Sequence, residues 1–413
     1  MLSKIRSIRN DALIKGSFIL VVMIVFANLL NYIFQVSMAR VLGPADYGIL
    51  AVLMSIIYIF LIPNEAIQTV ITKYTSVFNV NNNLGKIKDL LIRSMKKGLL
   101  AALLVLIIYF VLGFFLASFL KINLSLILLT GLFIFIVFTM PILRGILQGR
   151  KKFYGLGINM VIEAILKVIL ALIFIWIGWK VYGAMLAVIA ASSIAVLLVL
   201  LSIKEILSAK REREEFSNLY SQSLPIIIAM FSIVLMYSID IILARRFFSP
   251  QIAGEFAFVS LIGKVIVFVS SSIGKALFPL SAEEFEKGNK SESLLKKAVL
   301  MVIPMIIVSL LLYLVAPEFI IKLLSLGSTQ YLGGASILFI LGLSYSLISL
   351  TNIIVLYKLS VKKMHKSAYF LLLFVIIEII LLSIFNSNII EFSLSILFSN
   401  LLMFLYSFLL IKK

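Results

Sequence analysis

Long apolar blocks, each long enough to cross a lipid bilayer, alternate with short polar breaks along almost the whole chain of 413 residues. A spanning helix needs about 20 mainly apolar residues. These blocks are too long for half-buried strands. We therefore predict an all-α integral membrane protein with twelve transmembrane helices, at 17–39, 46–73, 97–119, 124–147, 156–178, 181–203, 223–247, 251–279, 298–320, 331–357, 367–386 and 389–411.

The composition excludes a soluble protein. Hydrophobic residues make up 62% of the chain and charged residues 13%, whereas a soluble domain has about 45–50% and about 25%. The twelve blocks leave only short loops, so no separate soluble domain fits. Because the chain has no cysteine, it has no disulfide framework and no thiolate site. Nothing in the sequence predicts a metal, a cofactor or a catalytic residue.

The net charge of +19 would suggest nucleic acid as a partner in a soluble chain. Here the basic residues lie between apolar blocks, where they set orientation in the membrane. Of the 37 Lys and Arg residues, 29 fall in one set of alternate breaks and 6 in the other, and Lys167 and Lys264 lie inside spans. We predict a multi-pass protein of the cell (inner) membrane with both termini cytoplasmic and with no nucleic-acid partner.

An internal repeat divides the chain into halves. The pattern Arg-x3-Pro-x3-Gly at 40–48 recurs at 246–254. Six spans in each half give the halves the same orientation, so we expect a pseudo-twofold axis along the membrane normal, as in some transporters. The predicted parts are a cytoplasmic interfacial segment at 1–15, a six-helix bundle at 16–206, a cytoplasmic linker at 207–222 and a second bundle at 223–413. The two bundles would face each other across a central cavity.

Four short motifs resemble those of one transporter family. They are SMARVLGPADYG at 37–48, RGILQGR at 144–150, Asp240 with AGEFA at 253–257, and Phe-Pro at 278–279. Together they resemble the polysaccharide transporter family of O-antigen and oligosaccharide flippases, within the multidrug/oligosaccharidyl-lipid/polysaccharide exporter superfamily. Lipid II flippases are similar but usually carry two further spans. The resemblance implies translocation of a lipid-linked glycan.

Lys264 is the most informative charge inside a span. A charge there costs at least about 2.5–3.5 kcal/mol on insertion scales, so we expect it to be functional or paired. It shares one helical face with Ser260 and Lys275, and this face could line a cavity. We predict that Lys264 binds the substrate diphosphate. The alternative interpretation is a structural bridge from Lys264 to Glu378 or Asp240.

Span five carries Asn159, Glu163 and Lys167 at intervals of four residues. Glu before Lys at this spacing is the favourable order for a pair within one helix. The two charges could therefore only neutralise each other, or Lys167 could contact substrate. Arg144 and Lys275 lie near cytoplasmic ends, where they could support diphosphate binding or extend to the interface.

Three amides in span one, Asn28, Asn31 and Gln35, form another polar face. Amides suit sugar hydroxyls, and they are equally suited to bonds between neighbouring helices. We include all three among the predicted substrate contacts.

Three acidic residues are candidates for ion coupling. Glu65 is favoured because it lies beside Pro63, where we expect a kink in span two. A bend next to an acid could act as a gate, or it could be a static kink. Asp240 and Glu378 are the other candidates. The coupling ion would be a proton or sodium.

The sequence therefore predicts a flippase that moves a polyprenyl-diphosphate-linked oligosaccharide from the cytoplasmic to the outer face by alternating access. The alternative is a proton- or sodium-coupled extruder of drugs or organic cations. The chain has no Walker-type phosphate loop, and its external loops are too short for an active-site domain, so we do not expect an enzyme. The expected partners are the lipid-linked oligosaccharide, the coupling ion and membrane lipids, with the protein acting as a monomer.

Overall fold

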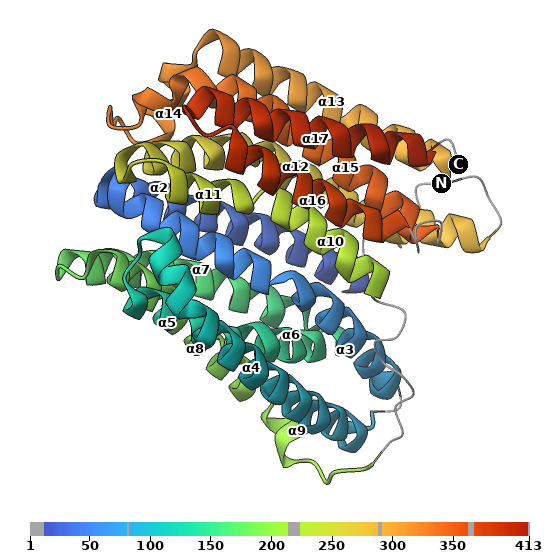
Figure 1. Cartoon of the computed structure of the whole chain (residues 1–413). Coiled ribbons are helices and arrows are strands. Elements are labelled where there is room, and N and C mark those ends of the chain that lie inside the picture. Colours follow the sequence, from blue (N-terminus) through green and yellow to red (C-terminus); the bar gives the residue numbers. More distant parts are fainter. Residues whose placement is uncertain (1–11, 81, 214–223, 288–290, 362–366, 412–413) are drawn as a thin grey trace. The chain divides into compact units, whose positions relative to one another are not determined.

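The structure is a computed structural model that describes residues 12–80, 82–213, 224–287, 291–361 and 367–411, and all its regular elements are helices (Figure 1). They are α2 (Ala12–Phe60), α3 (Ile62–Val80), α4 (Leu84–Leu120), α5 (Leu124–Gly131), α6 (Phe133–Gly149), α7 (Phe153–Trp176), α8 (Lys180–Ser202), α9 (Lys204–Ser208), α10 (Leu224–Met236), α11 (Ile239–Phe247), α12 (Pro250–Glu286), α13 (Glu292–Val315), α14 (Pro317–Leu324), η1 (Leu332–Gly334), α15 (Ala335–Ser360), α16 (Ser367–Ile384) and α17 (Ile389–Ile411).

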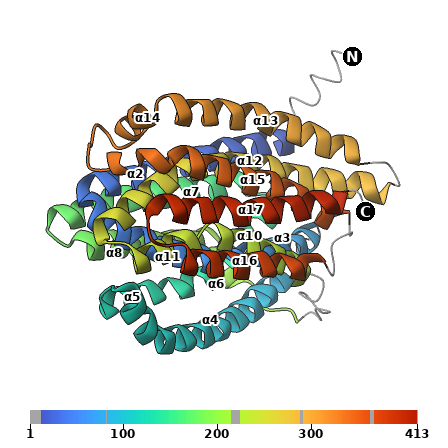
Figure 2. The same cartoon turned by 45° about the horizontal axis from the view of Figure 1, so that its top comes forward.

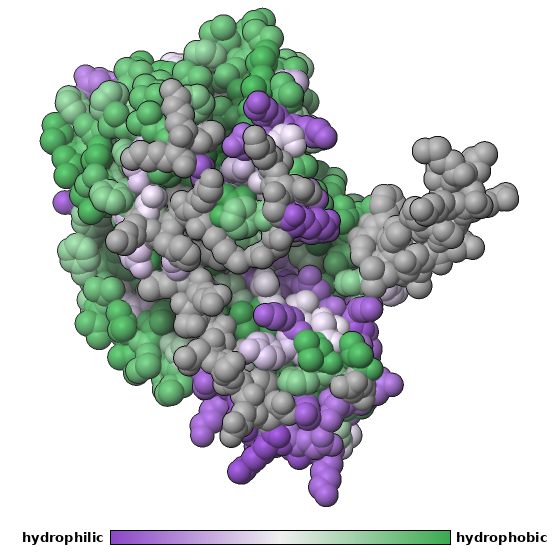
Figure 3. Space-filling model, turned by 90° about the vertical axis from the view of Figure 1, so that its right-hand side faces the viewer, coloured by the Kyte–Doolittle hydropathy of each residue, from purple (hydrophilic) through white to green (hydrophobic). Residues whose placement is uncertain are grey.

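The prediction of an all-helical membrane protein is confirmed. Within the described ranges, 11 helices are long and apolar enough to cross a membrane, and the first of them extends over 62 residues from Ile19 to Val80. On the face drawn in Figure 3, hydrophobic side chains cover the upper and left parts, and hydrophilic side chains gather toward the lower edge. The protein is therefore a multi-pass membrane protein.

Several predicted spans differ from the observed helices because single residues break the backbone pattern. The polar break predicted near 40–45 is helical on both sides, with a sharp change of direction at Gly43, where φ is 72° and ψ is 170°. Only glycine adopts positive φ without steric cost. At the expected kink near Pro63 the helix is interrupted at one residue, since α2 ends at Phe60 and α3 begins at Ile62. Two further spans are interrupted, at Leu132 and at 237–238.

The chain divides into two compact units. The first comprises residues 1–41 and 60–221, and the second comprises 42–59 and 222–413. The second half of α2 therefore belongs, by its contacts, to the unit that holds the C-terminal helices. The predicted interfacial segment at 1–15 and linker at 207–222 fall largely outside the described residues.

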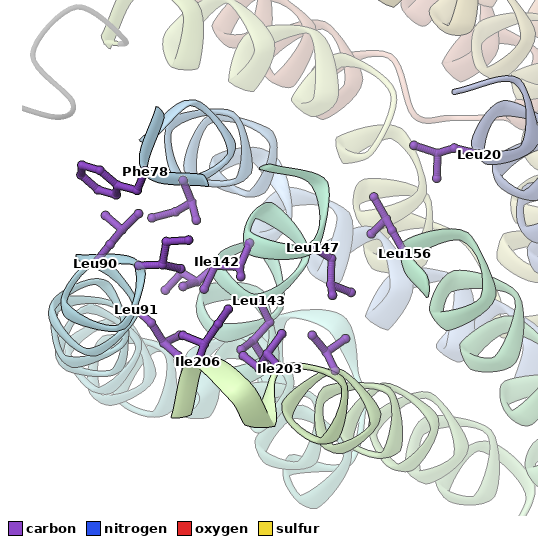
Figure 4. Packing of buried hydrophobic residues seen from close by; sticks show 14 residues of the cluster. Leu20, Phe78, Leu90, Leu91, Ile142, Leu143, Leu147, Leu156, Ile203 and Ile206 are labelled. Carbon is purple, nitrogen blue, oxygen red and sulfur yellow. The ribbon is translucent and has the colours of Figure 1, made fainter. Parts of the chain in front are cut away.

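The first unit is built around α6, which packs against α3, α4, α7 and α8. Buried aliphatic side chains from these helices form one cluster. Leu90 and Leu91 of α4 lie next to Ile142 and Leu143 of α6, and Ile206 of α9 lies beside them (Figure 4). The short helix α9 is therefore held to this unit by apolar contacts.

The second unit is built around α15, which packs against α12, α13 and α17. Figure 2 shows α15 running alongside α12 and α17. Small hydroxyl pairs join α12 to α15, with Ser270 to Ser349 at 2.8 Å and Ser281 to Ser360 at 2.6 Å. Small polar residues allow close helix approach in membranes and supply hydrogen bonds there.

The two copies of the Arg-x3-Pro-x3-Gly repeat pack directly on each other within the second unit. A Cβ on Gly254 would lie 1.7 Å from the carbonyl oxygen of Pro44, and a Cβ on Gly48 would lie 3.0 Å from the Cα of Gly254. Tyr47 is 1% exposed, and its ring lies 6.0 Å from the ring of Phe258. The glycine that ends each copy of the repeat is therefore required for a close backbone contact.

This contact predicts an effect of one methyl group. Gly254→Ala should lower the apparent melting temperature of the purified protein, because the backbone must shift at a cost of about 1–3 kcal/mol. Gly155→Ala is the control, since a Cβ there meets nothing within 4 Å. Alanine also favours a helix more than glycine does, so the control should be as stable as wild type or slightly more stable. Equal melting temperatures for the two variants would contradict the prediction.

Candidate functional site

The first unit contains a charged cluster that joins α6, α7 and α8. Arg144 of α6 donates from Nε and Nη2 to Oδ1 of Asn159, at 3.0 and 2.8 Å. Its Nη2 also lies 2.6 Å from Oε2 of Glu163. Asn159 and Glu163 are four residues apart, so α7 presents both on one face. Ser192 of α8 donates to Oε1 of Glu163. Arg144 thus has both an ion pair and two amide hydrogen bonds.

Lys167 extends this cluster by one helical turn. Its Nζ donates to Oδ1 of Asn31 on α2 and lies 5.1 Å from the ring centroid of Phe34. A cation over an aromatic ring is attracted to the negative ring face. The cluster holds two cations, Arg144 and Lys167, and one acid, Glu163. The side chains of Arg144 and Glu163 retain 14% and 21% exposure, so the cluster is partly accessible and carries one surplus positive charge.

The second unit contains a separate and fully buried cluster on α11, α12 and α15. The Nζ of Lys264 lies 3.1 Å from Oδ2 and 3.3 Å from Oδ1 of Asp240. The hydroxyl of Tyr345 donates to Oδ2 of Asp240, and Ser260 donates to the same oxygen at 3.3 Å. Lys264 is 5% exposed, and the other three residues are 0% exposed.

The break before α11 explains the position of Asp240. The helix begins at Ile239, so Asp240 lies in its first turn. The first N–H groups of a helix have no partner within the helix and favour a negative charge. The backbone N–H of Ile241 donates to Oδ1 of Asp240 at 2.7 Å. The interruption at 237–238 therefore creates a carboxylate site in the middle of a predicted span.

Glu378 of α16 completes the second cluster. Its side chain is 0% exposed, and neither carboxylate oxygen has a hydrogen-bond partner among the described residues. It lies close enough to Asp240 and Lys264 to interact with both electrostatically. The cluster therefore holds two acids and one base, the reverse of the balance in the first unit.

The structure brings most of the predicted site residues into these two clusters. Arg144, Lys167 and Asn31 lie in the first, and Lys264, Asp240 and Glu378 lie in the second. Arg144 points at Asn159 and Glu163 and does not extend to an interface. Of the two interpretations of Lys264, the bridge to Asp240 is present. The ion-pair partner of Glu163 is Arg144 on a neighbouring helix.

Three predicted residues lie outside the clusters, and a fourth is not described. Asn28 is exposed and Gln35 is buried. Glu65 is exposed in the first turn of α3. The side chain of Lys275 lies outside the described part of the structure.

Sequence reasoning missed Tyr345 and Ser192. Both lie inside apolar blocks, where one hydroxyl among small and apolar residues is common in membrane helices. The only signal in the sequence was that an acid inside an apolar block needs hydrogen-bond donors from other helices when it is buried.

Several solved structures of membrane transporters are similar to this chain in fold. An inward-facing multidrug resistance MATE transporter of the MOP superfamily has a TM-score of 0.75 at 14% identity, covering 94% of each chain. The lipid II flippase MurJ, in an inward closed conformation, has a TM-score of 0.73 at 15% identity, covering 96% of this chain and 88% of that one. A MOP superfamily transporter from Pyrococcus furiosus has a TM-score of 0.66 at 14% identity, covering 96% and 94%. The fold is therefore the one that these transporters share.

A family model described as "Polysaccharide biosynthesis protein" matches residues 13–285. The chain belongs to this family, as the four motifs indicated. None of the curated proteins matches its sequence significantly.

The cluster in the first unit predicts strong coupling between Arg144 and Glu163. Arg144→Met or Glu163→Gln alone leaves a partly buried charge without its partner, so the double variant should lose less stability than the sum of the two. We expect a coupling of about 1 kcal/mol or more in a double-mutant cycle of thermal unfolding. The exposed pair Lys287 and Glu283 is the control, with a coupling of at most about 0.5 kcal/mol. Equal coupling in both pairs would contradict a structural role for the buried pair.

Proposed function

We propose that the protein is a flippase that moves a polyprenyl-diphosphate-linked oligosaccharide from the cytoplasmic to the outer face of the cell membrane by ion-coupled alternating access. Membership of the polysaccharide biosynthesis family supports a glycan as cargo. The surplus positive charge inside the first unit is the observation that carries the proposal. A diphosphate cannot cross hydrocarbon unaided, because an isolated ion is strongly disfavoured there, and it must meet fixed cations.

The proposed topology has twelve spans in two six-helix bundles with both termini cytoplasmic. The helical stretch from Ile19 to Val80 has 62 residues, about 90 Å at the usual rise per residue. This is about three times the thickness of the hydrocarbon core. Counting it as two spans, separated at Gly43, gives twelve in total. The interfacial segment and the linker belong to the same proposal.

Arg144 and Lys167 are the proposed ligands of the diphosphate. The guanidinium of Arg144 can bind phosphate oxygens in a bidentate manner, and Lys167 adds a second cation on the neighbouring helix. Asn31, which accepts from Lys167, could turn to a sugar hydroxyl when phosphate takes its place. Asn28, Gln35 and the Lys275 side chain stay predicted substrate contacts.

Lys264 has a different place in this scheme. Its ammonium is fully buried and paired with Asp240, so a diphosphate would have to displace that carboxylate. The pairing favours a role for Lys264 in the coupling cluster, together with Asp240 and Glu378. Glu65, which is exposed, stays the alternative coupling residue.

Extrusion of organic cations is the second candidate function. The surplus of acid in the second unit favours it, because a buried carboxylate can neutralise a cationic drug. The two candidate functions differ in the sign of the charge on the transported molecule. A purified protein in proteoliposomes can be offered both a lipid-linked glycan and an organic cation.

The flippase proposal predicts a charge requirement in the first unit. Arg144→Gln and Lys167→Met should each lower translocation of a defined lipid-linked oligosaccharide at least tenfold, which corresponds to about 1.4 kcal/mol. Lys97→Met is the control, because Lys97 is exposed in α4. The measurement is the appearance of the glycan on the far side of proteoliposomes that contain equal amounts of folded protein. Full translocation by both variants, or efflux of the organic cation alone, would contradict the proposal.

A further inference from the structure

The geometry of the second cluster points to a proton as the coupling ion, carried by Glu378, with Lys264 as a built-in counter-ion in the place that a metal cation would take. The link to transport rests on the proposed function. The statement about which ion binds rests on the cluster alone.

The two carboxylates of the cluster have very different surroundings. Asp240 is surrounded by donors, namely Lys264, Ser260, Tyr345 and the N–H of Ile241. Glu378 is equally buried, yet both its oxygens lack hydrogen-bond partners among the described residues. A carboxylate that is ionised needs such donors, whereas a protonated one needs far fewer. Donors that stabilise a carboxylate are therefore present at Asp240 and absent, among the described residues, at Glu378.

Charge balance leads to the same assignment. Asp240 and Lys264 neutralise each other, so ionised Glu378 would leave one uncompensated negative charge inside the hydrocarbon. Such a charge costs several kcal/mol. A proton on Glu378 makes the cluster neutral with no change in the Asp240–Lys264 pair. Glu378 thus carries a proton in the arrangement that the structure describes.

Among the described residues, the other elements packed on α16 supply no second cation near Glu378. This helix packs against α10, α11 and α17. The described residues of α10 include no titratable side chain. On α11, Arg245 interacts with Asp46, and Arg246 is its neighbour. On α17, Glu391 lies in the first turn, and Tyr406 donates to the carbonyl of Ser367 at the start of α16. The groups that interact electrostatically with Glu378 are Asp240, Lys264 and Tyr345 of α15, whose hydroxyl donates to Asp240.

A metal cation fits this cluster poorly. Hard cations take several oxygen ligands, and the oxygens of Asp240 already accept from an ammonium, two hydroxyls and a backbone N–H. Only the two oxygens of Glu378 remain. A proton needs one of them. The ammonium of Lys264 therefore selects a proton over sodium by pairing with the carboxylate of Asp240.

Loss of this proton would change how α16 packs. An ionised Glu378 attracts Lys264, so the ammonium would be shared between α11 and α16. Protonation returns Lys264 to Asp240 and releases α16. If the two arrangements belong to different access states, the proton shifts their balance by its differential affinity. Glu378 would take the proton from water on the outer side and release it to cytoplasmic water, while the glycan moves outward.

The first test asks which ion binds, by melting of the purified protein in sodium chloride or N-methyl-D-glucamine chloride at equal ionic strength. Wild type should melt at the same temperature in both salts. Lys264→Ala should melt higher in sodium, because two vacated carboxylates can then bind the ion and ligand binding stabilises the folded state. Lys167→Ala, which removes a partly buried cation in the first unit, should not respond. Stabilisation of wild type by sodium, or no response of a folded Lys264→Ala protein, would overturn the inference.

The second test asks where the proton lies, and it does not depend on the Lys264 variant. Glu378→Gln keeps the shape of the protonated acid and cannot ionise. As pH rises, wild type should lose stability relative to Glu378→Gln, because Glu378 ionises freely in the unfolded chain and is held protonated in the folded one, whereas glutamine does not titrate. Glu391→Gln, an exposed acid on α17, should follow wild type. Parallel melting curves for wild type and Glu378→Gln between pH 5 and pH 9 would overturn the inference.

A transport measurement separates this inference from the proposed function. In proteoliposomes, a pH gradient should drive glycan translocation by wild type, and Glu378→Gln should retain glycan binding but no longer respond to the gradient. If wild type does not translocate the glycan, the proposed function is wrong. The melting tests still decide which ion the cluster binds. Translocation that is driven by a sodium gradient and does not respond to pH would contradict a proton as the coupling ion. It would leave the proposal of a flippase standing.

Discussion

The cost of placing charge in hydrocarbon is the constraint on which the rest of this structure depends. This cost explains why the sequence consists of long apolar blocks, and why the buried charges inside them are gathered into clusters. Arg144 lies with Glu163 in the first unit, and Lys264 lies with Asp240 in the second. Each cluster leaves one charge over, positive in the first unit and negative in the second. The surplus charge is what a cargo or a coupling ion can act on.

Much of the fold could be predicted because hydropathy alone specifies a spanning helix. The breaks inside helices could not, because each depends on one residue whose backbone conformation is set by its neighbours. Gly43 has positive φ within an otherwise continuous helix. The interruption before Ile239 contains no proline or glycine from which the sequence could predict it. That second break matters most, since it places Asp240 at a helix N-terminus.

The sequence could predict which residues belong to the candidate site. It predicted less well which of these residues interact with each other. A charge within an apolar block is visible in the sequence, which is why Lys264, Lys167 and Glu378 were found. Its partner lies on another helix, and which helices touch follows from packing. Glu163 pairs with Arg144 of α6, although Lys167 is its neighbour along α7. Tyr345 was missed for the same reason, because only the fold brings its hydroxyl to Asp240.

The opposite surplus charges of the two clusters suit an exchange of unlike cargo. An anionic diphosphate would compensate the first unit, and a proton on Glu378 compensates the second. With its proton bound the second unit is neutral, whereas in the first unit the surplus positive charge offsets only part of the negative charge of the diphosphate. Coupling between them requires that one ligand change the affinity for the other, and by linkage the effect is mutual. The free energy for such coupling is available here, because one uncompensated buried charge costs several kcal/mol.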